Sequence, residues 1–181
     1  MILLIALRWR FKKWGKALEK PFGTLAKKDF TSASPQACVD KRFVCTGEEN
    51  GITISIARLE GNGWQEPFTL NDDGWEISGC PVNGPAISSI DRLVAVAWFT
   101  GAKGVSAVKI AFSDDDGRSF ATPLSIEHQD PIGRVDLEML PDGSALVSWV
   151  EWIDGNEVIS ICRASQKHGC KTQQRLALNA G

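Results

Sequence analysis

Alternating apolar and polar positions run through the chain from residue 51 onward. Segments of seven to ten residues there are rich in β-branched and aromatic residues, and glycine, asparagine and aspartate separate them. A period of two predicts β-strands, and the short connections predict antiparallel hairpins. The predicted strands are GITISIARL (51–59), LVAVAWFT (93–100), VSAVKIAFS (105–113), RVDLEML (134–140), ALVSWVEW (145–152) and NEVISICRAS (156–165).

Residues 1–49 follow a different pattern. MILLIAL is a run of only seven apolar residues, and the basic stretch RWRFKKWGK follows it. A secretory signal has the opposite order, so we expect no functional signal peptide here. Leu3, Leu7 and Trp14 recur on one side of a helix, which predicts a short amphipathic helix over roughly residues 2–19. A helix lying on a membrane surface is the alternative interpretation of its tryptophan and lysine content.

The chain repeats itself with a period of about 50 residues. Aligning residues 84–126 with residues 133–178 places Trp98 on Trp149, and the earlier stretch 51–71 matches only the second half of this unit. Each whole unit has four predicted strands. Four-stranded units repeating at this spacing are typical of β-propeller blades.

This repeat predicts the organisation of the chain. We expect an N-terminal helical or irregular segment over 1–49, and part of an all-β propeller with four-stranded antiparallel blades over 50–181. The propeller part comprises a half blade (51–71) and two whole blades (85–126 and 134–179).

Two and a half blades cannot close a ring. The blade faces around Ile54, Ile56, Ile159 and Ile161 are therefore expected to be exposed at the two ends of the chain. Open sheet edges and exposed apolar faces favour association with other chains. We accordingly expect self-association through the open blade edges.

Charge and composition narrow the classes of partner. The chain has 20 basic and 22 acidic residues, a formal net charge of -2 and a pI of about 5.7. Acids and bases are interspersed, which provides no basic stripe for nucleic acid. No segment approaches the roughly 18 apolar residues of a membrane span. We expect neither a nucleic-acid partner nor a membrane span.

The segment SDDDGRSF between the third and fourth predicted strands of the unit 85–126 has the strongest local signal. Aspartate and serine side chains can bond the amides of their own loop, glycine supplies a positive φ, and the aromatic residue plugs the space between sheets. A calcium loop would need a terminal bidentate glutamate, which is absent here. We interpret the segment as a structural turn, with a metal loop or a catalytic acid as alternatives. Its key positions are Ser113, Asp115, Gly117, Ser119 and Phe120.

This pattern resembles the Asp-box, or bacterial neuraminidase repeat, of sialidase-like propellers. A second resemblance, to bacterial propeller proteins related to exo-alpha-sialidases, is carried by DDGWEISGCPVNGPAIS (72–88) and GRVDLEMLPDGSALVSWVE (133–151). It spans roughly residues 50–180 and implies a six-bladed parent propeller. It also implies a glycan partner, sialylated or otherwise acidic, and a periplasmic or secreted location. We expect no cofactor and no metal.

Sialidase chemistry requires residues that this chain does not have. Sialidases use a tyrosine nucleophile activated by a glutamate, three arginines that hold the substrate carboxylate, and an aspartic acid that protonates the leaving oxygen. This chain contains no tyrosine. The resemblance therefore implies a fragment of a glycosidase lineage that is inactive by itself. A non-catalytic propeller module that binds glycan or protein is the alternative.

Candidate binding residues lie at the strand ends of the repeat. Arg134 and Asp136 begin the inner strand of the last unit, where they either bind an anionic sugar or form a salt bridge between blades. Asn83 either bonds a ligand or completes a rigid turn. Glu151 is either the partner of an absent nucleophile or a charge at a strand end.

Aromatic residues present a similar choice. Asp73 and Trp75 form an acid-plus-aromatic loop suited to stacking on a sugar ring, although tryptophan at such a position also fills the space between blades. Trp98 and Trp149 are repeat-equivalent, so we expect both in the core.

Five cysteines show no metal-ligand spacing. Cys162 lies within an apolar strand and is interpreted as a buried thiol. Cys80 is expected to pair with Cys38 or Cys45 if the protein is exported. The odd count leaves at least one thiol free.

Overall fold

The computed structural model describes residues 38–40, 43–46, 53–76, 84–126 and 130–177. All of them belong to one compact unit, Pro35–Gly181. The helix predicted near the N-terminus lies outside the described residues. In the part that is described, no helix has the length and apolar character needed to cross a membrane.

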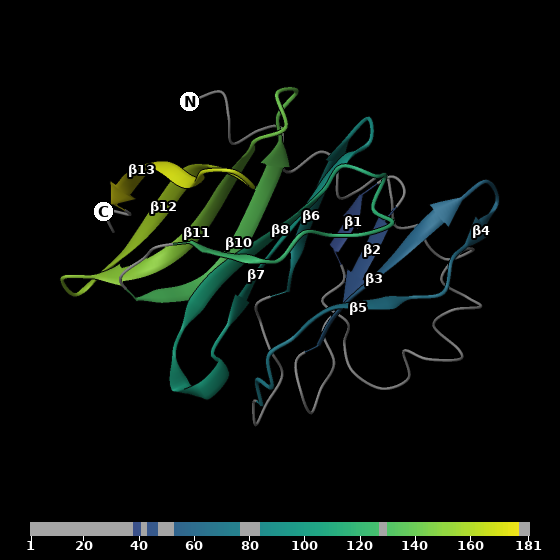
Figure 1. Cartoon of the computed structure of the whole chain (residues 1–181). Coiled ribbons are helices and arrows are strands. Elements are labelled where there is room, and N and C mark those ends of the chain that lie inside the picture. Colours follow the sequence, from purple (N-terminus) through teal and green to yellow (C-terminus); the bar gives the residue numbers. More distant parts are fainter. Residues whose placement is uncertain (1–37, 41–42, 47–52, 77–83, 127–129, 178–181) are drawn as a thin grey trace, which may run out of the picture. The chain divides into compact units, whose positions relative to one another are not determined.

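The strands form three antiparallel sheets, each of which is one blade (Figure 1). Blade 1 contains β1 (Cys38–Asp40), β2 (Phe43–Thr46), β3 (Thr53–Glu60) and β5 (Phe68–Asp72), and β4 (Gly63–Trp64) pairs with the end of β3. Blade 2 contains β6 (Ala86–Ile90), β7 (Leu93–Thr100), β8 (Ala107–Ser113) and β9 (Leu124–Ile126). Blade 3 contains β10 (Pro131–Met139), β11 (Ala145–Ile153), β12 (Asn156–Ser165) and β13 (Gly169–Ala177). The chain is therefore an all-β, incomplete β-propeller with four-stranded antiparallel blades, as the repeat predicts.

Blade 1 is larger than the sequence indicates. We expected only a half blade beginning at residue 51, but β2 pairs with β3 through Val44 opposite Ala57, and β1 pairs with β2. These two strands come from the segment predicted to be separate from the propeller. They are only three and four residues long, too short for a period of two to stand out from the surrounding sequence.

Two apolar cores lie between consecutive blades. We call the face of a blade that packs on the following blade its back, and the opposite face its front. The first core joins the back of blade 1 to the front of blade 2, and the second joins the back of blade 2 to the front of blade 3. Strand alternation explains this arrangement, because successive side chains point to opposite faces of a sheet.

Ile54 and Ile56 belong to the first core. They are 2% and 1% exposed, so the prediction that both residues lie on an open blade face is wrong. Trp98 and Trp149 are each 1% exposed and lie in the first and second core, respectively. The prediction that both tryptophans are core residues is confirmed.

Antiparallel connectivity gives the blades two distinct ends. We call one of them the crossover end. At this end the chain passes from β5 to β6 and from β9 to β10, and the β7–β8 and β11–β12 connections lie at the same end. The loop between β8 and β9 lies at the opposite end. The first strands of the blades are neighbours, since β6 contacts both β1 and β10. First strands are thus the inner strands, which surround the central channel of a propeller.

Candidate functional site

Arg134 lies in a β-bulge on the inner strand of blade 3, near the crossover end. The register of β10 with β11 shifts between Pro131 and Gly133 and again between Gly133 and Asp136. Gly133 has a φ of 108° and Arg134 has a φ of 54°. The left-handed region costs a residue with a Cβ about 1 kcal/mol, and bulges of this kind re-aim side chains beside functional sites. The bulge therefore sets the direction in which the side chain of Arg134 leaves the strand, and the residue is exposed.

Asp136 follows on the same strand and is also exposed. One of its carboxylate oxygens accepts a hydrogen bond from the backbone N–H of Leu137 at 2.9 Å. This contact fixes the carboxylate close to its own strand. Asn83 lies outside the described residues, so its role as a ligand or as a turn residue stays a prediction.

Glu151 is the one fully buried carboxylate among the described residues, with 0% exposure. Its Oε1 accepts a hydrogen bond from Trp149 Nε1 at 2.7 Å, and its Oε2 accepts one from Ser160 Oγ at 2.9 Å. Arg175 Nε lies 3.5 Å from Oε2 and supplies the opposite charge. A buried carboxylate needs such partners to offset its desolvation. Because both of its oxygens accept hydrogen bonds and the residue has no access to solvent, Glu151 has a structural role in connecting strands.

Asp73 forms an ion pair that connects two blades. Its Oδ2 lies 2.9 Å from Lys109 Nζ, and both side chains are largely buried. Burial raises the pKa of Asp73, but hydrogen bonds from Lys109 and Thr100 and the charge of Lys109 outweigh that effect and hold the pKa below its usual range. Asp73 is therefore a charged partner of blade 2.

Trp75 lies in the core between blades 1 and 2. It is 9% exposed and packs edge-on against Phe99, with ring centroids 5.4 Å apart. A Cβ at Gly101 would come within 2.8 Å of Trp75 Nε1, so this packing requires glycine there. The buried ring presents no platform on which a sugar could stack. The structure thus agrees with the alternative interpretation, in which Trp75 fills the space between two blades.

In both cores, polar side chains lie beside the repeat-equivalent tryptophans Trp98 and Trp149. Several of these polar residues were not predicted from the sequence as site residues. Trp98 pairs with Lys109 in the register, as Trp149 pairs with Ser160. Lys109 and Ser160 thus lie opposite the equivalent tryptophans, and each bonds a carboxylate. For Lys109, the sequence did contain a signal: a lysine inside the apolar strand VSAVKIAFS indicates a charged side chain that needs a partner. Ser160 and Arg175 carried no comparable signal.

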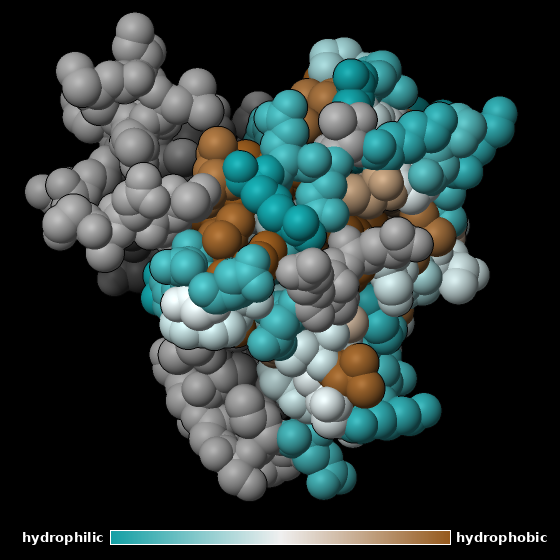
Figure 2. Space-filling model, turned by 90° about the vertical axis from the view of Figure 1, so that its left-hand side faces the viewer, coloured by the Kyte–Doolittle hydropathy of each residue, from teal (hydrophilic) through white to brown (hydrophobic). Residues whose placement is uncertain are grey.

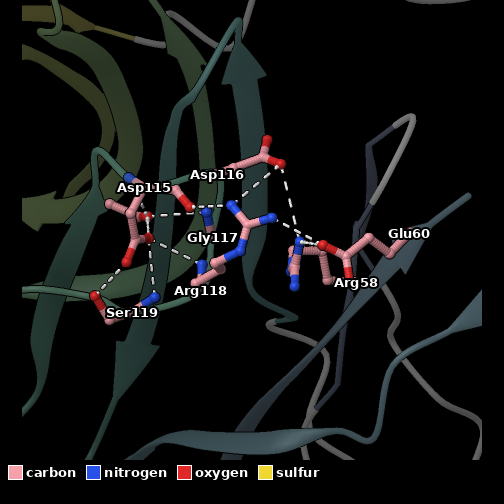
Figure 3. A network of polar contacts seen from close by, with 8 residues as sticks. Arg58, Glu60, Asp115, Asp116, Gly117, Arg118 and Ser119 are labelled. Atoms are coloured by element: carbon pink, nitrogen blue, oxygen red, sulfur yellow. Dashed lines mark hydrogen bonds and ion pairs between the residues drawn. The ribbon is translucent and has the colours of Figure 1, made fainter.

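The loop after β8 is held by the side chain of Asp115 (Figure 3). Its Oδ1 accepts hydrogen bonds from the backbone N–H groups of Arg118 and Ser119, both at 2.9 Å, and from Ser113 Oγ at 2.8 Å. Its Oδ2 accepts a hydrogen bond from Ser119 Oγ at 2.6 Å. Hydrogen bonds from Ser119 and Ser113 hold the pKa of Asp115 far below its usual range. The backbone of Gly117 has a φ of 71°.

The same loop reaches across to blade 1. Arg118 Nη2 lies 2.8 Å from Glu60 Oε1, and Arg58 Nη1 lies 2.9 Å from the same oxygen. Asp116 Oδ2 is 3.9 Å from both arginines (Figure 3). Hydrogen bonds from Arg58 and Arg118 lower the pKa of Glu60. The loop therefore contributes ion pairs between the blades at the end opposite Arg134.

Phe120 closes the loop on its apolar side. It is half-buried and packs against the first core, and its ring centroid lies 6.3 Å from that of Phe68. In the described ranges, no three His, Cys, Asp or Glu residues gather in a group that could hold a metal ion.

The cysteines differ from the sequence-based interpretation. Cys162 on β12 forms a disulfide with Cys170 on β13, with Cα atoms 5.7 Å apart. The prediction of a buried free thiol at Cys162 is therefore wrong. Cys38 and Cys45 are opposite each other in the register of β1 and β2, and Cys80 lies outside the described residues.

Comparison with solved structures supports the fold. The chain resembles a xylan beta-1,4-xylosidase from Bacillus halodurans C-125, with a TM-score of 0.50 and 10% sequence identity over 81% of this chain and 32% of that one. A mutant of the NanB sialidase from Streptococcus pneumoniae matches with a TM-score of 0.47 and 12% identity over 80% of this chain and 23% of that one. The chain thus spans at most a third of these proteins. No protein-family model matches the sequence, and no curated protein matches it.

Proposed function

We propose that this chain is a segment of a sialidase-like, carbohydrate-active propeller of the exo-alpha-sialidase-related lineage, and that it binds an acidic glycan without hydrolysing it. The observation that carries the proposal is Arg134, an exposed residue in a left-handed bulge on the inner strand of blade 3. Inner strands surround the channel in which propellers bind their ligands. A planar guanidinium pairs with a carboxylate through two parallel hydrogen bonds.

The sequence and the fold support a carbohydrate ligand. The loop after β8 has the residue pattern of an Asp-box, and Asp115 forms the hydrogen bonds that such a turn requires. A xylosidase shares the fold. The Asp-box loop and Arg134 lie at opposite ends of the blades, so this loop has a structural role in the proposal and does not contact the glycan.

Lack of hydrolysis follows from the residue inventory. The chain has no tyrosine to serve as a sialidase nucleophile, and Glu151 is fully buried and hydrogen-bonded on both oxygens. A general base must reach the proton that it abstracts. The second candidate is a non-catalytic propeller module that binds glycan or protein through the channel side. The lack of tyrosine and the burial of Glu151 favour it.

Two measurements on the chain test the proposal. A fluorogenic sialoside should show no turnover. Titration with sialyllactose should show saturable binding that weakens at least tenfold in Arg134→Ala, because a charge-assisted pair is lost. Lys167→Ala is the matched control, since Lys167 is an exposed cation in the turn at the opposite end. Turnover by the chain, or equal binding by Arg134→Ala, would overturn the proposal.

A further inference from the structure

Two β-hairpins of this chain each carry a pair of cysteines. The hairpin of β12 and β13 carries Cys162 and Cys170, which are eight residues apart in the sequence and form a disulfide. The hairpin of β1 and β2 carries Cys38 and Cys45, which are seven residues apart. The fifth cysteine, Cys80, follows in the sequence between β5 and β6.

The disulfide of blade 3 is protected by the fold. Cys162 is 1% exposed and belongs to the second core, and Cys170 packs against the same core. The hairpin that it closes lies at the outer edge of the blade, on the side that faces the viewer in Figure 2, where hydrophilic residues surround the apolar ones that reach the surface. Disulfides persist in oxidising compartments and are rare where glutathione and thioredoxin keep thiols reduced. Any other pair of cysteines within bonding distance in this chain therefore meets the same oxidising conditions.

Strand register brings a second pair of cysteines to this distance. Cys38 on β1 is directly opposite Cys45 on β2, and the register from this pair to the pair of Asp40 and Phe43 has no shift. Directly opposite residues of antiparallel strands have Cα atoms about 4.5 or 5.5 Å apart, depending on the type of pair. A disulfide needs a Cα separation of about 4.4 to 6.8 Å. The backbone of the β1–β2 hairpin thus meets this requirement in either type of pair.

The β1–β2 hairpin is short and lies at one side of its sheet. Its strands have only three and four residues, and β1 is the terminal strand, connected to β3 through β2. A two-stranded hairpin has marginal stability by itself. β1 is also the inner strand of blade 1 and contacts β6 of the next blade. A covalent link across this hairpin would therefore secure the inner strand of blade 1.

We infer that Cys38 and Cys45 form a second hairpin disulfide, so that the chain carries one disulfide in blade 1, one in blade 3 and a single free thiol at Cys80. This pairing differs from the sequence-based expectation, in which Cys80 pairs with Cys38 or Cys45. The inference rests on the register of β1 and β2 and on the disulfide of blade 3. It is independent of glycan binding.

The bond forms by thiol–disulfide exchange with a disulfide donor, either oxidised glutathione or the disulfide of a protein oxidoreductase. The thiolate of one cysteine attacks a sulfur of the donor, which gives a mixed disulfide and releases one donor thiolate. The thiolate of the other cysteine then attacks the protein sulfur of the mixed disulfide and releases the second donor thiolate. Two protein thiols are thus oxidised to one disulfide, the donor is reduced to two thiols, and these take up the two protons that the cysteines lose.

A peptide map of the wild-type chain tests the pairing. The chain is equilibrated with a mixture of reduced and oxidised glutathione, its free thiols are blocked with N-ethylmaleimide, and it is digested with trypsin without reduction. Trypsin places the three cysteines in separate peptides, residues 29–41, 43–58 and 59–92. We expect peptide 29–41 to be linked to peptide 43–58, and peptide 59–92 to carry one N-ethylmaleimide group.

Other maps would contradict the pairing. A link from peptide 59–92 to either of the other two peptides would overturn the inference, because Cys80 would then have a partner. N-ethylmaleimide on both Cys38 and Cys45 would overturn it as well, since the hairpin would then carry two free thiols. Unlinked Cys162 and Cys170 in the same digest would also overturn it, because the inference rests on oxidation of that pair.

Hydrogen exchange measures what the link does for blade 1. In Cys38→Ala/Cys45→Ala, the backbone amides of β1 and β2 should exchange at least about tenfold faster than in the wild-type chain, because the hairpin opens more often without covalent closure. Cys80→Ala is the matched control, since it removes a thiol and no link, and its exchange should equal that of the wild-type chain. Equal exchange of these amides in both variants would overturn the inference. The peptide map needs no substitution, so it decides the inference even if the double variant does not fold.

Discussion

Asp115 organises the loop after β8 with one carboxylate. Asp115→Ala removes the acceptor of two backbone N–H groups and two hydroxyl groups. We expect the free energy of unfolding to fall by about 1 to 2 kcal/mol, since the loop is partly exposed and water replaces some of these bonds. Chemical denaturation measures the change. Asp114→Ala is the control: Asp114 is exposed and its loss should cost less than about 0.5 kcal/mol. Equal losses for both variants would show that Asp115 does not hold the loop.

Acid should remove this contribution. Hydrogen bonds from Ser119 and Ser113 lower the folded-state pKa of Asp115, and the unfolded value is about 3.9. A lowered folded-state pKa stabilises the protein above the unfolded pKa, and this stability is lost as the pH falls through the folded-state pKa. The gap in melting temperature between wild type and Asp115→Asn should therefore be constant from pH 7 to about pH 5 and narrow below about pH 4. A gap that stays constant into strong acid would contradict this assignment.

Glu151 connects three strands of blade 3. In Glu151→Ala, Trp149 Nε1 and Ser160 Oγ lose their acceptor and a cavity remains. We expect a loss of about 2 to 4 kcal/mol in the free energy of unfolding. Glu138→Ala provides the comparison, because Glu138 is exposed on β10. A change in Glu151→Ala as small as that in Glu138→Ala would mean that the buried network contributes nothing.

The disulfide fastens the hairpin of β12 and β13. Replacing Cys162 and Cys170 with alanine should lower the free energy of unfolding by roughly 2 kcal/mol, the value expected for a short closed loop. The pairing itself can be read by mass spectrometry. A non-reduced tryptic digest should contain the peptide ending at Arg163 linked to His168–Lys171. Finding both peptides unlinked in protein kept under oxidising conditions would contradict the pairing.

In blades 2 and 3 the strand patterns predicted the long strands β7, β8, β10, β11 and β12, and the 50-residue repeat indicated four strands in each blade. Blade 1 was only partly predicted. Its first two strands are too short to show a period and are stabilised by pairing with β3, which is a tertiary effect that local sequence does not encode. The burial of Ile54 and Ile56 depends on a neighbouring blade in the same way.

The candidate site was harder to predict than the fold. Arg134 could be selected from its place at the start of a strand, but its left-handed φ is a consequence of the bulge and has no residue signature of its own. Glu151 and Trp75 were plausible site residues by type, and only three-dimensional packing shows that both are buried. Lys109 pairs with a residue 36 positions away, a distance over which sequence alone gives no contact.

Arg134 lies in the bulge on the inner strand of blade 3 and is exposed. The glycan proposal depends on recognition of a carboxylate by that side chain. The most direct measurement compares N-acetylneuraminic acid with its methyl ester in titrations of the wild-type chain. Esterification removes the negative charge and leaves the sugar otherwise intact, so we predict at least tenfold weaker binding of the ester, and no such difference in Arg134→Ala. Equal affinity of the wild-type chain for the acid and the ester would contradict acidic-glycan recognition at Arg134.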